Sequence, residues 1–252
     1  LEALRMLRLE NHIRMYQAST SELFGNACEV PQTEETPFRP CSPYAAAKVY
    51  AYWITKTYRE AYNMFCCNGI LFNHESPLRG ELFVTKKITK AVAAINAGQQ
   101  KELYLGNLNA CRDWGYAGDY VEAMWRMLQH DYPDDYIVAT GQIYSVRQFV
   151  EKAFSYIGVK ILWEGEGMNE VGYDKQTGRE YVFVSEQHFR PYDIQALMGD
   201  ARKAKKVLGW QPTMSFDELV YHMVEGDIRS KAMTQSCDVY STSYFLKKWK
   251  EL

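Results

Sequence analysis

The sequence lacks the motifs that define several common classes of protein. Its six cysteines form no Cys-x-x-Cys pair, its five histidines are scattered, and no Gly-x-Ser-x-Gly motif is present. Zinc sites and α/β-hydrolase nucleophiles depend on such spacings, so neither is supported. No apolar run approaches the roughly 20 residues that cross a bilayer. We therefore expect no metal and no membrane partner.

An excess of charge of either sign is also lacking. The 252 residues carry 29 Lys and Arg against 31 Asp and Glu, a formal net charge of -2. Because nucleic-acid-binding surfaces are strongly basic, we expect no nucleic-acid partner. Hydrophobic residues make up 47% of the chain, enough for one large core or two smaller ones. Cysteines without a disulfide pattern are typical of a cytoplasmic protein, where thiols stay reduced.

A Gly-rich dinucleotide-binding turn is absent as well. The chain starts at Leu1 without an initiator methionine, and its first ten residues have leucines on helical spacing. We expect it to be the C-terminal two-thirds of an enzyme, with about 100 residues of the nucleotide-binding half upstream.

Apolar segments alternate with helical ones along the chain, which predicts a parallel α/β sheet. Expected strands are 13–19, 66–73, 103–105, 136–140, 160–163 and 181–184. Expected helices are 1–10, 43–62, 83–97, 118–130, 146–156, 201–208 and 216–228. A polar, Gly-rich stretch at 165–179 is expected to be a loop.

The predicted fold is the C-terminal part of a doubly wound parallel (Rossmann-like) sheet with a smaller α/β substrate-binding lobe. Residues 1–141 are assigned to the second half of the nucleotide-binding domain, with substrate-lobe segments interleaved. Residues 142–230 are assigned mainly to the substrate lobe, and 231–252 form a tail without an assigned role.

Tyr44 and Lys48 are candidate catalytic residues. The pattern Tyr-x-x-x-Lys occurs four times in the sequence, so it has little weight alone. This pair differs because it opens a helix after Ser42-Pro43, about twenty residues beyond a buried strand. Residues four apart share a helix face, and a nearby ammonium favours the phenolate. Tyr44 is therefore a candidate general base for a sugar hydroxyl.

Hydroxyl and carboxylate groups follow the first predicted strand. Thr20, Ser21 and Glu22 come where the chain leaves the sheet, and ligands of open α/β sheets bind beyond the carboxyl ends of strands. A carboxylate there can take a proton beside a carbonyl. For a single Glu, a cap or a solvated loop residue is the commoner interpretation, but the neighbouring hydroxyls favour a site.

Several further side chains have the chemistry to bind phosphates or sugars. Arginine is the preferred bidentate ligand of phosphate, although most single surface arginines are unrelated to function. The candidates are Asn73, His74, Arg79, Lys87, Arg112 and Arg190.

The sequence resembles the GDP-mannose 4,6-dehydratases, of the extended short-chain dehydrogenase/reductase family. The resemblance is found in five segments: YQASTSELFG (16–25), SPYAAAKVYAYWITKTYREAY (42–62), NGILFNHESPLRGELFVTKKIT (68–89), LGNLNACRDWGYAGDYVEAMW (105–125) and IVATG (137–141). It runs from residue 1 to about residue 230.

The resemblance implies a lyase reaction with NADP as cofactor. Tyr44 would deprotonate the hydroxyl at carbon 4 of GDP-mannose while hydride passes to NADP. Glu22 would take the proton at carbon 5, water would leave from carbon 6, and the hydride would return there. The product would be GDP-4-dehydro-6-deoxymannose, the first step toward GDP-fucose and other GDP-deoxysugars.

The resemblance also implies binding roles and partners. Thr20 would be catalytic and would bond the reacting oxygen, and Lys48 would orient the cofactor ribose. Tyr44, Lys48, His74 and Arg79 match cofactor-binding positions. Substrate-binding positions are matched by Thr20, Ser21, Asn73, Lys87 and Arg112, and more loosely by Arg190. A homodimer or homotetramer would be expected.

Three residues depart from the family pattern. Cys41 and Leu78 stand where relatives usually carry arginine, and Tyr116 stands where they usually carry histidine. None of the three removes a catalytic group. Two other functions remain open: another nucleotide-sugar dehydratase or epimerase, or a non-catalytic, oligomerising fragment that lacks the cofactor loop.

Overall fold

The computed structural model describes residues 1–188 and 196–237 and divides into two compact units. Each unit combines several separate stretches of chain. The first contains Leu1–Ser76, Asn109–Val146 and Arg190–Leu219, and the second contains Pro77–Leu108, Arg147–Phe189 and Val220–Leu252. The roles expected for 1–141, 142–230 and 231–252 stay predictions.

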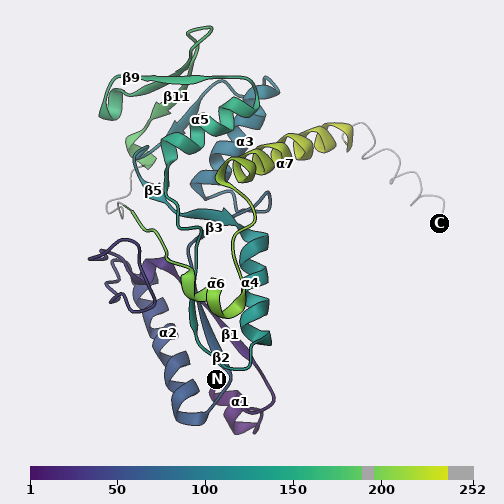
Figure 1. Ribbon diagram of the computed structural model, residues 1–252. Coiled ribbons are helices and arrows are strands. Elements are labelled where there is room, and N and C mark those ends of the chain that lie inside the picture. Colours follow the sequence, from purple (N-terminus) through teal and green to yellow (C-terminus); the bar gives the residue numbers. More distant parts are fainter. Residues whose placement is uncertain (189–195, 238–252) are drawn as a thin grey trace, which may run out of the picture. The chain divides into compact units, whose positions relative to one another are not determined.

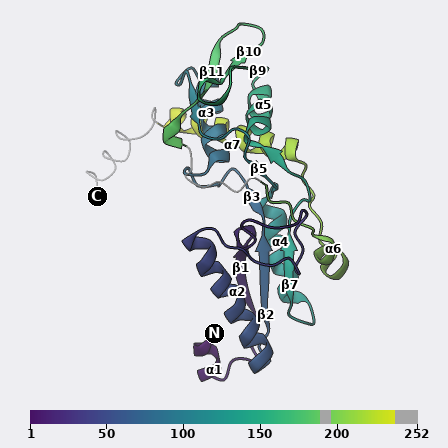
Figure 2. The same ribbon diagram turned by 90° about the vertical axis from the view of Figure 1, so that its left-hand side faces the viewer.

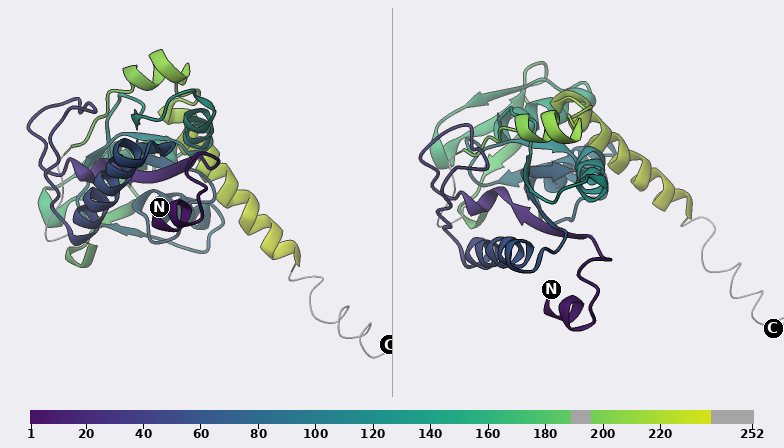
Figure 3. Two further views of the ribbon diagram at one scale, coloured as in Figure 1. Left: turned by 90° about the horizontal axis from the view of Figure 1, so that it is seen from below. Right: turned by 60° about the horizontal axis from the view of Figure 1, so that its bottom comes forward.

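The first unit is built on a parallel sheet with the strand order β1-β2-β7. These strands are Met15–Thr20, Cys66–Leu71 and Asp135–Val138. Every residue of β2 and β7 is buried, as expected for a parallel sheet covered on both faces. Helices α2 (Pro43–Tyr62) and α4 (Ala117–Gln129) flank β1 and β2 on opposite sides (Figures 1 and 3). The predicted doubly wound fold is confirmed.

Helix α2 begins and ends where its sequence signals predict. The Ser42 hydroxyl accepts a hydrogen bond from the Ala45 amide at 3.0 Å, and Pro43 occupies the first turn. At the other end Asn63 adopts a left-handed conformation with φ of 52°, which stops the helix. Ser42 and Pro43 thus fix the start of α2, and therefore the position of Tyr44 in its first turn.

Two apolar clusters pack against the faces of this sheet. On the α4 side, Tyr120, Ala123 and Met127 meet strand residues and the buried indole of Trp210. The other cluster contains Leu23, Phe24, Tyr52, Ile70, Phe72, Ile137, Ala139 and Leu197. Both faces of the sheet are therefore covered by close-packed side chains.

Short elements complete the first unit. They are α1 (Glu2–Met6), η1 (Ser21–Leu23), β3 (Asn73–Glu75), β5 (Cys111–Arg112), β6 (Trp114–Tyr116), β8 (Tyr144–Ser145) and α6 (Arg202–Leu208). β3 pairs with β6 in parallel, and β5 pairs with β8 antiparallel. These two pairs were not predicted, because strands of two or three residues show no periodicity.

The second unit contains a four-stranded sheet with the order β4-β11-β10-β9. The strands are β4 (Leu103–Leu105), β9 (Ile161–Glu164), β10 (Val171–Asp174) and β11 (Glu180–Val184). The helical elements are α3 (Val84–Asn96), α5 (Val146–Tyr156), α7 (Phe216–Cys237), η2 (Gly167–Asn169) and η3 (Glu186–His188). Figure 2 shows α3, α5 and the adjoining part of α7 on one side of this sheet.

Two expectations for this unit were wrong. The sheet is mixed, since only β4 and β11 are parallel. The stretch 165–179 is not a loop throughout, because it contains β10. Gly172, one of the glycines that made this stretch Gly-rich, lies inside the strand, where a Cβ would come within 2.9 Å of the Trp163 ring. Close packing therefore explains this glycine better than chain flexibility does.

The outer edge of β7 is covered by the loop that follows η1. Glu34 accepts a hydrogen bond from the Ile137 amide at 2.9 Å. Gln32 forms backbone hydrogen bonds with Met198 and Asp200, each 2.8 Å long, and its side chain accepts from the Met198 amide. The backbone groups that an edge strand would leave unpaired are thus partly satisfied on this side.

A buried carboxylate fastens α2 to the sheet. Asp135, in β7, accepts two hydrogen bonds from the Arg59 guanidinium at 2.8 and 2.9 Å. Tyr52 and Asn68 donate to the same carboxylate, each at 2.8 Å. Burial opposes the charged form, but the hydrogen bonds and charge of Arg59 outweigh it, so the pKa of Asp135 lies below its ordinary value.

We expect Asp135→Asn to lower the free energy of unfolding at neutral pH by about 3 kcal/mol, because Arg59 would stay buried without its counter-charge. Because the pKa of Asp135 is lower in the folded state, its ionised form stabilises the folded protein at any pH above the unfolded-state pKa of about 3.9. This stabilisation is lost as the pH falls through the folded-state pKa. In urea denaturation, the difference in the free energy of unfolding between Asp135→Asn and wild type should therefore become smaller below about pH 4. The exposed Asp131→Asn is the control, and an equal effect of both variants would contradict the assignment.

Candidate active site

Three of the predicted residues lie at the carboxyl end of β1. Thr20 is the last residue of the strand, and its hydroxyl accepts a hydrogen bond from the Glu22 amide at 3.3 Å. Ser21 is buried, and Glu22 is partly exposed within η1. Because η1 packs beside α2, these hydroxyl and carboxylate groups lie next to the helix that carries Tyr44 and Lys48.

Tyr44 and Lys48 lie close together in the first turns of α2. The Tyr44 side chain is 52% exposed, so its hydroxyl can reach a ligand. Lys48 donates a hydrogen bond to the Ala18 carbonyl at 2.9 Å, and its Nζ lies 5.8 Å from the centroid of the Tyr44 ring. The ammonium is thus tied to β1 while it stays close to the phenol.

A buried hydroxyl lies beside this group. Ser19 is 5% exposed, and its Oγ has no hydrogen-bond partner among the residues that the structure describes. Buried polar groups are normally satisfied, so the Ser19 hydroxyl is an exception within the described residues.

The next strand brings a second group of predicted residues to the same edge. β3 pairs with β6, which places Asn73 opposite Trp114 and His74 opposite Gly115. The His74 Nδ1 donates to the Phe72 carbonyl at 2.9 Å, and its ring stacks on Tyr120 with centroids 5.0 Å apart. Both contacts fix the orientation of the imidazole.

Arg112 lies in β5, two residues before the strand that pairs with Asn73. Its side chain is partly buried and donates to the Cys111 carbonyl at 2.7 Å. The first unit contains eight of the predicted residues: Thr20, Ser21, Glu22, Tyr44, Lys48, Asn73, His74 and Arg112.

Asp113, which the sequence did not single out, fixes the loops next to Arg112. Its fully buried carboxylate accepts hydrogen bonds from the Thr140 amide and hydroxyl at 2.9 and 2.6 Å. It also accepts from the Gly141 and Gly199 amides at 2.9 and 3.4 Å. Burial raises the pKa of Asp113, and these hydrogen bonds act in the opposite direction.

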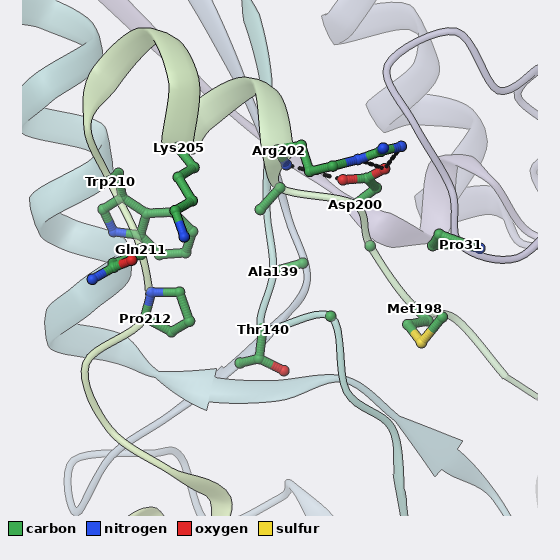
Figure 4. Close-up of a pocket in the computed structure, with 13 residues that line it drawn as sticks. Pro31, Ala139, Thr140, Met198, Asp200, Arg202, Lys205, Trp210, Gln211 and Pro212 are labelled. Atoms are coloured by element: carbon green, nitrogen blue, oxygen red, sulfur yellow. Dashed lines mark hydrogen bonds and ion pairs between the residues drawn. The ribbon is translucent and has the colours of Figure 1, made fainter.

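A cleft of about 540 Å³ lies beyond the end of β7 (Figure 4). It is lined by Pro31, Ala139, Thr140, Gly141, Met198, Gly199, Asp200, Ala201, Arg202, Lys205, Trp210, Gln211 and Pro212. None of the predicted site residues is among them. Three of the lining residues, Thr140, Gly141 and Gly199, donate hydrogen bonds to Asp113, so this carboxylate connects the wall of the cleft to the segment that carries Arg112.

Two predicted residues belong to the second unit. The Arg79 guanidinium lies 3.5 Å from the centroid of the Phe83 ring. The Lys87 Nζ lies 2.8 Å from the Nε2 of His188, a residue that sequence reasoning grouped with the scattered histidines. Burial lowers the pKa of Lys87, and burial together with the charge of Lys87 lowers the pKa of His188. Arg190 lies outside the described residues.

Other kinds of site receive no support from the described residues. Within 1–188 and 196–237, no group of His, Cys, Asp and Glu side chains is arranged to hold a metal ion. In the same ranges no helix has the length and apolarity needed to cross a membrane. The five described cysteines, Cys28, Cys41, Cys66, Cys67 and Cys111, are free thiols.

Comparison with known proteins gives consistent results. A sequence profile described as GDP-mannose 4,6 dehydratase matches residues 1–223. The GDP-mannose 4,6 dehydratase of Dictyostelium discoideum is 57% identical over 228 residues, covering 90% of this chain and 64% of that protein. The Homo sapiens protein of the same name is 56% identical, covering 90% of this chain and 61% of its own length. The chain thus spans less than two thirds of these relatives.

The fold is shared with RMD from Pseudomonas aeruginosa, solved in complex with NADPH. The TM-score is 0.74 at 19% identity, covering 90% of this chain and 70% of that one. This likeness defines the class: an α/β protein with a Rossmann-like parallel sheet. Within that class, the chain belongs to the GDP-mannose 4,6-dehydratase family.

We expect Asp113→Ala to lower the free energy of unfolding by about 3 kcal/mol, because several buried donors would lose their acceptor. Asp113→Asn should cost less, since its amide oxygen still accepts from Thr140. Chemical denaturation measures both, with the exposed Asp131→Ala as control. Equal stability of Asp113→Ala and the control would rule out the proposed anchoring.

Proposed function

We propose that the protein is a GDP-mannose 4,6-dehydratase, a hydro-lyase that converts GDP-mannose to GDP-4-dehydro-6-deoxymannose. The observation that carries this proposal is the position of Thr20, Glu22, Tyr44 and Lys48 at the junction of β1 and α2, in a chain of that family. The chain spans 61–64% of the two relatives' lengths, so the activity is proposed for the whole protein.

In this proposal the chain's own residues move the protons. Tyr44 removes the proton from the hydroxyl at carbon 4, and Lys48 favours the phenolate that this step requires. Thr20 bonds the oxygen at carbon 4. Glu22 removes the proton at carbon 5, which the adjacent ketone makes acidic, and returns this proton to the hydroxyl at carbon 6, which leaves as water. NADP, when bound, supplies reversible storage of one hydride.

The residues present fit a nicotinamide cofactor at this edge. Lys48 is held by the Ala18 carbonyl next to the half-exposed Tyr44, and the buried Ser19 hydroxyl still needs a partner. We propose that Tyr44, Lys48, His74 and Arg79 hold NADP. Ligands of open α/β sheets bind at this end of the strands, which supports the assignment of Tyr44, Lys48 and His74.

We assign the nucleotide-sugar contacts to Ser21, Asn73, Lys87, Arg112 and Arg190, together with Thr20. Support is strongest for Lys87. Lys86 and Lys90, on the same helix, each pair with a carboxylate, whereas the partner recorded for Lys87 is the imidazole of His188. Among the described residues this partly buried ammonium has no carboxylate partner, and such a group favours an anion such as a diphosphate.

We further propose a cytoplasmic homodimer or homotetramer. The five described free thiols suit a reducing compartment. The exposed aromatic side chains Tyr50 and Trp53 on α2 suit an interface between subunits. Light scattering of the full-length protein tests the assembly, and a monomer would refute it.

Two other functions compete with this proposal. An epimerase or another nucleotide-sugar dehydratase would use Tyr44 and Lys48 as well, but an epimerase has no need of Glu22 as the base for elimination. A non-catalytic module would turn over no nucleotide sugar. Mass spectrometry tests the proposal against both: the proposed enzyme removes one water from GDP-mannose, whereas an epimerase and a binding module leave the mass unchanged. Chromatography of the sugar nucleotide then separates an epimerase, which forms a new isomer, from a binding module, which forms none.

We expect Tyr44→Phe to lower kcat by roughly a thousandfold, the usual range for loss of a general base. Reduced cofactor should not accumulate, because the first proton transfer fails. The measurement is turnover of GDP-mannose by the full-length protein, and Tyr62→Phe, at the exposed far end of the same helix, is the control. An unaltered rate would remove Tyr44 from the mechanism.

We expect Glu22→Gln to block elimination and leave the first oxidation intact. Reduced cofactor should then accumulate in a single turnover, seen in its near-ultraviolet absorbance, while no dehydrated product forms. Glu60→Gln, an exposed change on α2, should behave as wild type. Normal product formation by Glu22→Gln would show that another group removes the proton at carbon 5.

A further inference from the structure

A buried ion pair in the second unit joins two helices to a loop. Lys86 of α3 is 8% exposed and Asp227 of α7 is 6% exposed, with 2.5 Å between Nζ and Oδ1. The same ammonium donates a hydrogen bond to the Pro77 carbonyl at 2.7 Å. One charged group therefore holds α3, α7 and the residue that opens the Pro77–Phe83 loop.

This ion pair is expected to add little to the free energy of unfolding. The second carboxylate oxygen of Asp227 is buried and has no hydrogen-bond partner in the described part of the chain. A desolvated and unsatisfied oxygen costs free energy, and buried ion pairs often contribute no more than apolar residues of the same volume. What the pair does supply is a fixed direction for the Pro77 carbonyl.

A second contact between α7 and the loop is independent of charge. Gly226 packs directly against Pro77, and a Cβ at this glycine would lie 2.7 Å from the Pro77 Cβ. Real Cβ atoms do not approach so closely, so any larger residue here would displace the proline or the helix. α7 thus determines the backbone position at Pro77 in two ways.

The rest of the loop is tied back to α3. The Arg79 guanidinium lies over the ring of Phe83, the residue before the helix. Glu81 forms an ion pair with Lys90 of α3, with 2.6 Å between the charged atoms. With Pro77 fixed at one end and Phe83 at the other, the backbone that carries Arg79 has few alternative positions.

We propose that Asp227, Lys86 and Gly226 are positioning residues for Arg79, through which α7 sets the affinity for the phosphates of NADP. This inference rests on the proposed function, since it takes Arg79 as a cofactor ligand. The three residues act on the cofactor only by placing Pro77, two residues before Arg79. The family profile ends at residue 223, so Gly226 and Asp227 lie beyond the segment it matches.

The test is the dissociation constant of NADP⁺ from the cofactor-free, full-length protein, with GDP affinity measured in parallel. We expect Asp227→Asn and Gly226→Ala each to weaken NADP⁺ binding on the order of tenfold, as small displacements of binding groups do. GDP affinity, and kcat at saturating NADP⁺, should stay within about twofold of wild type. Arg79→Ala is the positive control, and Glu225→Gln on the exposed side of α7 is the matched negative control.

The outcomes separate the two proposals. If Arg79→Ala weakens NADP⁺ binding while Asp227→Asn and Gly226→Ala do not, the inference is overturned and the proposed function stands. Equal losses of NADP⁺ and GDP affinity would indicate a general structural role and would also overturn it. Should Asp227→Asn fail to fold by circular dichroism, Gly226→Ala decides, because it keeps the ion pair. A wild-type protein that binds no NADP⁺ overturns the proposed function and this inference together.

Discussion

Parallel hydrogen bonding between β1, β2 and β7 determines where the candidate residues of the first unit lie. Thr20 pairs with Leu71, and Leu71 pairs with Val138, so the three strands end side by side. Polar residues that follow separate strands in the sequence therefore meet at one edge. A shift of β1 by one residue would turn its side chains to the opposite faces and separate Thr20 from its present neighbours.

Three buried carboxylates hold the connecting segments of the first unit in place by hydrogen bonds. Asp135 joins α2 to β7, and Asp113 joins the loops at Thr140 and Gly199. Asp119 accepts from both the amide and the hydroxyl of Thr213. Each links segments far apart in sequence, so the order of the site depends on a few desolvated charges that must all be satisfied.

The sequence predicted long elements well because their signals are local. Ser42 and Pro43 fix the start of α2, and this position distinguishes the Tyr44–Lys48 pair from three others of the same spacing. The catalytic role of the pair stays a prediction. β10 was missed because its glycine is required by contact with Trp163, a residue outside its own strand.

Asp113 and His188 were missed for a related reason. Asp113 accepts hydrogen bonds from four donors in two loops that are distant in sequence. His188 contacts Lys87 of α3, about a hundred residues earlier in the chain. Neither lies in a pattern that periodicity or short motifs can reveal. Sequence reasoning therefore found the groups with reactive chemistry more readily than the groups that hold them in place.

The edge of the sheet at β7 is covered, whereas β1 is the other end of the strand order. Ile137 already donates its outward amide to Glu34, and Gln32 binds the backbone at Met198 and Asp200 alongside. A strand arriving from another segment or another molecule would have to displace these contacts to pair on that side. The strand order leaves β1 as the opposite end of the sheet, so any strand added to it joins next to the residues that lead to Glu22. The strand at the free end of the strand order, β1, is therefore also the strand that leads directly into η1 and Glu22.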